Sequence, residues 1–339
     1  MQIVKSVLLK NFRSHDEFAA DFTDGVSLIV GKNGTGKTSI LEAVYLLLNG
    51  TSFKSKDIEL IKNGKPNMFA EIQKTDGLTP RVIISLTDKA FKINGETSKK
   101  LKTEHRYPTV LFEPDDLNLI HNSPNARREY FDRFFGLLNT NYAATISGYK
   151  KAMTQRNKLL KSGFATTESV YSWDCLLAKY GSNILKLRTY GASQINQKIS
   201  DTYNTISDTL AKVELQYSGR VIDEQEYLAI LTGNFERDSI VGSTTFGPHR
   251  DDFLFIFNGK MAGQTASRGE NRTIILAEKF IEASAFTNAK GVSPIILLDD
   301  VFSELDDKRQ TALMSNFRDH QIIITAVAPP PKLNPLITL

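Results

Sequence analysis

The sequence predicts an α/β fold in which a mixed sheet is interrupted by an inserted, mainly helical domain. Residues 1–114 and 239–327 carry short apolar runs bounded by turn residues, which is typical of strands. Between them, in residues 115–238, apolar residues recur every three or four positions, the spacing of an amphipathic helix. A glycine-rich loop in the first stretch and paired acids in the last indicate that both belong to one domain.

The glycine-rich loop separates a buried strand predicted at 26–30 from a helix predicted at 39–48, with Gly50 as its stop. The loop fits the phosphate-loop pattern G-x-x-x-x-G-K-[ST]. Its residues are Gly31, Lys32, Asn33, Gly34, Thr35, Gly36, Lys37 and Thr38. Glycines let backbone N–H groups close around a triphosphate, and the helix start adds partial positive charge. We therefore predict a P-loop NTPase that binds ATP, with Lys37 on the β- and γ-phosphates and Thr38 ligating Mg²⁺.

Further strands are expected on both sides of this loop. They are predicted at 2–9, 69–73, 81–87 and 107–112, the last ending at Pro114. A hairpin is predicted at 91–96 because Asn94-Gly95 follows an alternating run. These elements and the loop make residues 1–114 the N-terminal half of an ATPase head.

The middle of the chain is predicted to be a compact helical arm, residues 115–238. One helix places five apolar residues on a single face: Tyr130, Phe131, Phe134, Phe135 and Leu138. Three more helices are predicted at 142–161, 170–189 and 192–213, and Gly163, Gly181 and Gly191 punctuate this part of the chain. No sustained heptad repeat is present, so we expect no long coiled coil.

Basic charge is concentrated in this arm. The whole chain has 42 basic and 38 acidic residues, but residues 121–215 hold 13 Lys and Arg against 7 Asp and Glu. Five of the basic residues follow one another without an acid: Lys150, Lys151, Arg156, Lys158 and Lys161. A local basic excess indicates a polyanionic partner such as DNA, and the alternative is an ordinary solvated helical face.

The C-terminal stretch supplies the acids that a phosphate loop needs. A strand is predicted at 253–257 with a turn at Asn258-Gly259, a helix at 271–288, a buried strand at 294–300, a helix at 306–318 and a strand at 321–326. Asp299 ends four consecutive apolar residues and is the expected Mg²⁺ ligand. The adjacent Asp300 is placed to polarise or deprotonate an attacking water. Residues 239–327 are thus the C-terminal half of the head, and residues 328–339, with Pro329-Pro330-Pro331, an extended tail.

A second anion-binding helix start is expected at Ser267-Arg268-Gly269-Glu270. Ser267 and Gly269 can present a hydroxyl and backbone N–H groups to a phosphate held by another copy of the chain. The alternative is an ordinary helix cap, in which Ser267 and Glu270 form a capping box.

Together these motifs resemble the ABC-type ATPase heads of the SMC superfamily and, among them, the RecF family of bacterial recombination mediators, from about residue 1 to 327. The shared stretches, besides the phosphate loop, are Asn11-Phe12-Arg13-Ser14, Phe112-Glu113-Pro114-Asp115-Asp116-Leu117, Arg127-Arg128-Glu129-Tyr130-Phe131-Asp132, Gly247-Pro248-His249-Arg250-Asp251-Asp252, Ser267-Arg268-Gly269-Glu270-Asn271-Arg272-Thr273 and Leu297-Leu298-Asp299-Asp300-Val301-Phe302-Ser303-Glu304-Leu305-Asp306.

The resemblance implies a mechanism. Two heads dimerise head to tail on ATP, Ser267 contacts the γ-phosphate in trans, Asp300 assists hydrolysis, and residues 303–306 cross the interface. The dimer binds double-stranded DNA at or near single-strand gaps and junctions, and slow hydrolysis releases it. The family acts with RecO and RecR partners in recombinational repair, replication-fork maintenance and the SOS response.

The sequence departs from the family pattern at three places. Arg268 and Glu270 stand where glutamines are common, no histidine follows Thr325, and the glutamine-loop position near residues 113–116 is not clearly matched. The other candidate functions are a small-molecule kinase or GTPase, a transporter ATPase subunit, and a scaffold that binds ATP without turnover. A GTPase is disfavoured because the Asn-Lys-x-Asp guanine motif is absent.

Bulk properties suit a cytoplasmic protein. Cys175 is the single cysteine, so no internal disulfide is possible. No apolar run approaches the roughly 18 residues of a membrane span, and the N-terminus is interrupted by lysines too early for a signal peptide.

Overall fold

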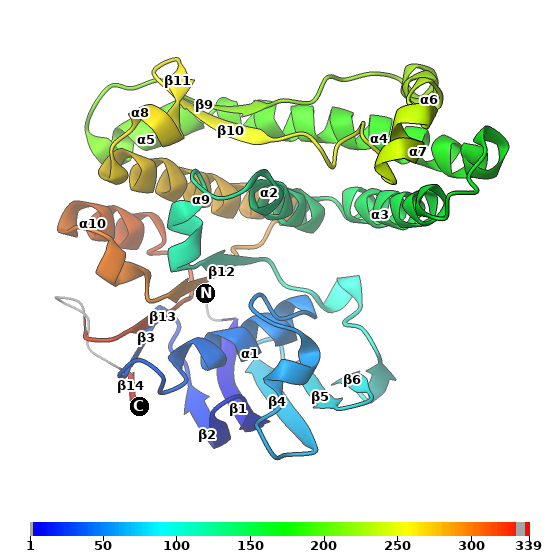
Figure 1. Cartoon of the computed structure of the whole chain (residues 1–339). Helices are drawn as coiled ribbons and strands as arrows, with labels where there is room; N and C mark the ends of the chain where they lie inside the picture. The colour runs from blue at the N-terminus through cyan, green and yellow to red at the C-terminus, as the bar shows by residue number, and fades with distance from the viewer. Residues whose placement is uncertain (1–2, 330–335) are drawn as a thin grey trace. The chain divides into compact units, whose positions relative to one another are not determined.

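The computed structural model describes residues 3–329 and 336–339, and the chain divides into two compact units (Figure 1). The first unit joins residues 1–116 to residues 282–339, and the second consists of residues 117–281. A short 3-10 helix, η3 (Pro114–Asn118), and the long helix α9 (Arg268–Lys290) run from one unit into the other. The N-terminal and C-terminal parts of the chain therefore share one unit.

A five-stranded sheet forms the centre of the first unit. Its order is β14-β3-β13-β12-β8, and every neighbouring pair is parallel. The strands are β3 (Val26–Val30), β8 (Thr109–Phe112), β12 (Ile295–Asp299), β13 (Ile322–Ala326) and β14 (Ile337–Thr338). Strands β8, β12 and β13 are buried along their whole length, which explains their unbroken apolar sequences. Because the strands are parallel, the residues that follow β3, β12 and β13 meet at one edge.

A second, antiparallel sheet has the order β2-β1-β4-β5-β6-β7. Its strands are β1 (Val4–Phe12), β2 (His15–Asp21), β4 (Asn67–Lys74), β5 (Arg81–Ser85), β6 (Lys89–Ile93) and β7 (Glu96–Ser98). The predicted turn at Asn94-Gly95 joins β6 to β7 with φ angles of 49° and 84°, in the left-handed region that this dipeptide tolerates.

Helix α1 (Lys37–Asn49) lies in the core that the two sheets of this unit share. It is buried on all sides from Ile40 to Leu48, and it packs in one cluster with strand residues of both sheets, such as Val7 and Leu297. An all-round apolar helix requires such a position. The helix ends at Gly50, which has φ 86° and donates its N–H to the carbonyl of Leu46 at 2.8 Å, so the predicted stop is confirmed.

The remaining elements of the first unit are short. They are η1 (Asp57–Leu60), η2 (Thr103–His105), η4 (Val301–Glu304) and α10 (Asp307–Asn316). The predicted helix at 306–318 is therefore present in a shortened form. Pro330 and Pro331 of the predicted extended tail lie outside the described residues.

The second unit is mainly helical and contains one small sheet. Its helices are α2 (Pro124–Leu138), α3 (Thr140–Lys161), α4 (Thr167–Asn196), α5 (Ile199–Ser207), α6 (Glu224–Gly233), α7 (Phe235–Val241) and α8 (Ala262–Thr265). The sheet is antiparallel with the order β11-β10-β9: β9 (Val213–Tyr217), β10 (Phe253–Phe257) and β11 (Lys260–Met261). Four aromatic residues predicted to share one helix face, Tyr130, Phe131, Phe134 and Phe135, are indeed buried along α2.

Helix α4 corrects the prediction of two helices at 170–189 and 192–213. It runs without a break through Gly181 and Gly191 (Figure 1, green). These glycines are needed for close packing, because a Cβ atom at Gly181 would lie 2.5 Å from the ring of Tyr227, and one at Gly191 would overlap the ring of Phe135. The rest of the second predicted range contains the shorter helix α5, and β9 begins at its last residue.

The boundary between the units differs from the expected one after residue 238. Strand β10 was expected in the sheet of the head, but it pairs with β9, with Phe255 opposite Leu215. On the buried face of β10, Phe253 packs against Phe131 of α2 with ring centroids 4.5 Å apart. Residues 239–281 therefore belong to the second unit. The first boundary, at 116, lies two residues from the expected 114.

Candidate nucleotide-binding site

The glycine-rich loop follows β3 directly, and α1 begins at Lys37. Gly34 and Gly36 have φ angles of 87° and 98°, a conformation that costs other residues energy. A side chain at Gly36 would also meet His15 and Ser14, since an added Cβ would lie 2.5 Å from the Ser14 hydroxyl. The Nε2 atom of His15 lies 3.1 Å from the carbonyl of Gly36. The turn that contains His15 therefore supports the loop from behind.

Lys37 is almost fully buried, and its side chain folds back into the loop. Its ammonium donates to the carbonyls of Gly31 at 2.8 Å and Lys32 at 3.2 Å. It also lies 3.7 Å from Oδ2 of Asp300. A lysine ammonium held within a glycine-rich loop at the start of a helix is placed to bind phosphate.

Thr38 and Asp299 meet, as the motifs predict. The Thr38 hydroxyl donates to the Asp299 carboxylate at 2.8 Å and 2.9 Å to its two oxygens. Thr325 donates to the same carboxylate at 2.7 Å. The parallel sheet places Thr325 next to this carboxylate, since Asp299 of β12 pairs with Thr325 of β13. Hydroxyl and carboxylate oxygens are the ligands that Mg²⁺ prefers, usually with only one or two carboxylates.

This oxygen cluster fits a magnesium ion bound together with a nucleotide. No group of three or more His, Cys, Asp or Glu residues that could hold a metal occurs in the part of the chain that the structure describes. A metal held by protein side chains alone is thus not supported within those residues. A hydroxyl and one carboxylate, with phosphate oxygens completing the shell, match the arrangement expected in a P-loop NTPase.

Asp300 is held in a strained conformation beside this cluster. Its φ angle is 51°, and its backbone N–H donates to both the carbonyl (3.2 Å) and the hydroxyl (3.0 Å) of Thr325. Burial raises the pKa of its carboxyl, against the opposing effect of the Lys37 ammonium, and the nearby Asp299 charge raises it further. Its Oδ1 atom is buried without a hydrogen-bond partner. An unsatisfied carboxylate oxygen in this position can accept a hydrogen bond from water.

The loop opens on a cavity of about 810 Å³, large enough for a nucleotide. Its lining residues are Arg13, Ser14, Asn33, Gly34, Gly36, Lys37, Thr38, Ser39, Lys54, Ile58, Glu59, Ile61, Lys62, Asn63 and Asp300. Four of these are cationic, so the cavity favours an anion.

A polar network beside the cavity was not predicted. Glu42 is buried in the apolar helix α1 and accepts two hydrogen bonds of 2.9 Å from the guanidinium of Arg13. It also accepts from the hydroxyls of Ser52 at 2.5 Å and Ser55 at 2.9 Å. The sequence feature that could have predicted this network is Glu42 itself, because an acid within an otherwise apolar helix is buried and a buried charge needs partners. The network fixes two cavity-lining segments to α1.

Ser267 lies in the second unit, at the start of α9, and is exposed. Its hydroxyl accepts from the N–H of Glu270 at 3.3 Å, and the Glu270 carboxylate accepts from the N–H of Ser267 at 2.7 Å. The capping box expected as the alternative at this helix start is therefore present. Its exposure leaves the helix start accessible to a ligand.

Residues 303–306 follow the same strand as Asp299 and Asp300. The Ser303 hydroxyl donates to the carbonyl of Asp300 at 2.8 Å, and Gln310 of α10 donates to the carbonyls of Phe302 and Leu305 at 2.8 Å and 2.9 Å. Asp306 caps α10 by accepting from the N–H of Arg309 at 2.9 Å. The segment is thus fixed by its own helix.

Comparison with known proteins decides the family. The model described as the RecF/RecN/SMC N terminal domain matches residues 3–330. The chain belongs to the RecF family. It is 34% identical over 95% of its length to the DNA replication and repair protein RecF of Ruminiclostridium cellulolyticum, covering 92% of that protein. It is also 34% identical over 92% of its length to RecF of Streptococcus pyogenes serotype M49, covering 88% of it.

Solved structures agree with this placement in the RecF family. A structure titled as the recombination mediator protein RecF-ATP in the RecFOR pathway matches with a TM-score of 0.87 at 30% identity, covering 98% of this chain and 94% of that one. The Smc head domain of Pyrococcus furiosus matches with a TM-score of 0.53 at 17% identity, which shows a shared fold alone. The fold is thus the ABC-type head of RecF and SMC proteins. Among the described residues, no helix has both the length and the apolarity to cross a membrane.

Proposed function

We propose that this chain is an ATP-gated DNA-binding protein that acts in replication and recombinational repair. The observation that carries the proposal is that the hydroxyls of Thr38 and Thr325 both donate to the Asp299 carboxylate. Lys37, the residue before Thr38, folds back into the phosphate loop. The loop leaves no room for a side chain at Gly36. In a RecF-family chain, this arrangement supports binding of ATP with Mg²⁺. When bound, Mg²⁺ neutralises charge on the phosphates, and Lys37 stabilises the same charge.

Hydrolysis is assigned to Asp300. Its partly buried carboxyl, with a free oxygen, orients a water for attack on the γ-phosphate. The strained backbone at φ 51° and the two hydrogen bonds from its N–H to Thr325 fix that orientation. In this proposal, turnover is slow and acts as a switch.

Dimerisation completes the site. In this proposal two chains bind head to tail, and the exposed Ser267 of each contacts the nucleotide that the phosphate loop of the other holds. The exposed lysines of α3, Lys150, Lys151, Lys158 and Lys161, contact duplex DNA near a gap. RecO- and RecR-type proteins are the expected partners. Arg156 is excluded from this surface, because it is fully buried in ion pairs with Asp174 and Asp238.

The test is sedimentation of the purified chain with and without ATP and Mg²⁺, each with and without a gapped duplex. A monomer that becomes a dimer only with ATP, and then binds the duplex, supports the proposal. Lys37→Ala and Ser267→Arg should each abolish the ATP-dependent dimer. Dimerisation that persists in both variants would contradict the head-to-tail arrangement. A monomer that ignores DNA in all four conditions would favour a P-loop ATPase or kinase acting on a small molecule.

A further inference from the structure

The turn at residues 247–252 is the stretch of the chain that the nucleotide site does not explain. Its sequence is Gly-Pro-His-Arg-Asp-Asp, and it connects α7 to β10 in the second unit. Five of its six residues are anchored to neighbouring helices and strands. Arg250 is the exception, and it is exposed.

The first half of the turn is fixed by buried groups. Gly247 has φ 132° and packs so closely that a Cβ atom would lie 2.5 Å from the Tyr149 hydroxyl. The carbonyl of Pro248 accepts from the buried Arg188 at 2.6 Å. His249 contacts the Tyr149 hydroxyl at 2.7 Å through Nδ1 and the carbonyl of Thr244 at 3.0 Å through Nε2.

The second half is fixed by its carboxylates. Asp251 accepts from the Tyr217 hydroxyl at 2.6 Å. Asp252 accepts two hydrogen bonds from Arg127 of α2, at 2.8 Å and 2.6 Å. Such bracing on both sides of one exposed residue is what a binding site needs to hold a side chain in place.

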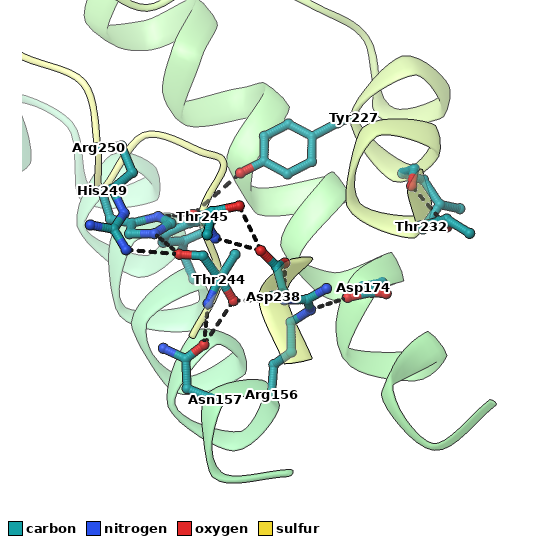
Figure 2. Close-up of polar contacts among 12 residues, drawn as sticks. Arg156, Asn157, Asp174, Tyr227, Thr232, Asp238, Thr244, Thr245, His249 and Arg250 are labelled. Atoms are coloured by element: carbon teal, nitrogen blue, oxygen red, sulfur yellow. Dashed lines mark hydrogen bonds and ion pairs between the residues drawn. The ribbon is translucent and has the colours of Figure 1, made fainter. Parts of the chain in front are cut away.

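The arginines in and around this turn differ in their partners. Arg127, Arg156 and Arg188 are buried, and each is paired with a carboxylate. Figure 2 shows one such pairing, Arg156 with Asp174 and Asp238, together with Thr244 and His249. Arg128 and Arg250 form no ion pair among the residues that the structure describes.

These two unpaired arginines are instead held by backbone carbonyls of the same segment. Arg250 donates to the carbonyl of Thr244 at 3.2 Å, and in Figure 2 it lies beside His249, which reaches the same carbonyl. Arg128 donates to the carbonyl of Asp251, the residue next to Arg250, and to the side-chain oxygen of Asn125 at 3.4 Å. A guanidinium has five N–H donors, so each keeps donors available for an anion.

We infer that Arg250, supported by Arg128, forms a phosphate-binding site on the second unit, and that its ligand is the sugar–phosphate backbone of DNA. The inference rests on the proposed function. A planar guanidinium group can donate two parallel hydrogen bonds to two oxygens of one phosphate. Contacts to phosphates position DNA without reading its sequence. A phosphate of ATP offers the same chemistry, so the experiment separates the two sources.

The experiment measures DNA affinity by fluorescence anisotropy over a range of salt concentrations, for the full chain and for Arg250→Ala, Arg250→Lys and Arg128→Ala. Arg220→Ala is the matched control, since Arg220 is an exposed arginine of the same unit that is paired with Glu226. Arg250→Ala should weaken DNA binding about tenfold and reduce the slope of log affinity against log salt by about one. Arg250→Lys should bind DNA more tightly than Arg250→Ala but less tightly than the wild type, because lysine keeps the positive charge but lacks the planar donor pair of the guanidinium.

Each outcome has one meaning. The inference is supported if Arg250→Ala loses DNA affinity but keeps its ATP affinity and melting temperature, and if Arg220→Ala keeps its DNA affinity. A loss of ATP affinity or ATP-dependent dimerisation instead, with unchanged DNA binding, assigns the phosphate to the nucleotide and overturns the DNA assignment. If Arg250→Ala and Arg128→Ala both bind DNA as tightly as the wild type, the inference is overturned but the proposed function is left intact. A wild-type chain that binds neither ATP nor DNA overturns both.

Discussion

The hydroxyl of Thr38 lies 2.8 Å from a carboxylate oxygen of Asp299, although 261 residues separate them in the chain. The contact joins the first turn of α1 to the end of β12, which lies two strands away from β3 in the parallel sheet. It places one hydroxyl and one carboxylate where a phosphate-bound metal needs them. The chemistry of the site therefore depends on the parallel pairing of strands from the two ends of the chain.

Thr38→Val should separate metal-dependent from metal-independent nucleotide binding. The variant keeps the volume of the side chain but removes the hydroxyl, so ATP affinity with Mg²⁺ should fall at least tenfold. In EDTA the affinity of the variant should match that of the wild type, because Lys37 and the loop amides are unchanged. Titration of a fluorescent ATP analogue under both conditions measures this. An equal loss in EDTA would show that the loop itself is damaged.

Asp300→Asn should abolish hydrolysis while raising stability. Burial raises the pKa of Asp300, so the folded state disfavours its charged form. The folded chain then retains this proton to a higher pH than the unfolded chain, and stability falls as the pH rises through the window just above the ordinary carboxyl range. At neutral pH the amide removes that cost, and the melting temperature should increase.

The wild-type ATPase should show the complementary pH profile. Because Asp300 must be ionised to accept a proton from the attacking water, turnover should increase with pH as the carboxyl loses its own proton. Single-turnover measurements between about pH 4 and pH 8 test this, in the presence of saturating ATP. If Asp300→Asn hydrolyses ATP at the wild-type rate, Asp300 takes no part in the reaction.

His249 should contribute a pH dependence to stability. Burial lowers its pKa to about 4. The unfolded chain, whose histidine titrates near its ordinary value of about 6.5, therefore binds more protons between these two values. Stability should rise with pH across this window and be lost as the pH falls through it. Urea unfolding at a series of pH values measures the slope, and His249→Gln should flatten it. An unchanged slope in the variant would assign the dependence to other groups.

The sequence predicts the site where a local motif defines it. The phosphate loop, Asp299 and Asp300 were identified because each stands at the end of an apolar strand. Thr325 was missed, because its role depends on β13 pairing with β12 in the sheet, and strand order is not encoded in any local pattern.

The errors in the arm have the same physical origin. Arg156 was grouped with four lysines of the arm because no acid stands among these basic residues in the sequence. Its partners Asp174 and Asp238 are 18 and 82 residues away. Likewise, β10 was recognised as a strand but assigned to the wrong sheet, because its partner β9 was not predicted. Long-range contacts decided each case.

Gly36→Ala and Gly34→Ala should separate backbone strain from crowding. Both positions have positive φ, which costs alanine about 1–2 kcal/mol. A Cβ atom at Gly34 meets nothing within 4 Å, whereas one at Gly36 overlaps His15 and Ser14. Gly36→Ala should therefore be the more destabilising change in urea unfolding, and it should also displace the support behind the loop and weaken ATP binding. Equal losses of stability would mean that the turn at residues 14–15 yields easily.

Arg156→Ala should destabilise the second unit without a direct effect on DNA binding, in contrast to Lys158→Ala, two residues away on the same helix. Arg156 is fully buried between Asp174 and Asp238, and its removal leaves two buried carboxylates without their cation. Breaking a buried ion pair in this way costs about 3–5 kcal/mol, whereas an exposed lysine costs less than about 0.5 kcal/mol. Urea unfolding should show this difference, and anisotropy with a labelled duplex, at a temperature where both variants are folded, should show the reverse order. A folded Arg156→Ala protein that loses more DNA affinity than Lys158→Ala would place the guanidinium at the DNA surface and contradict its structural role.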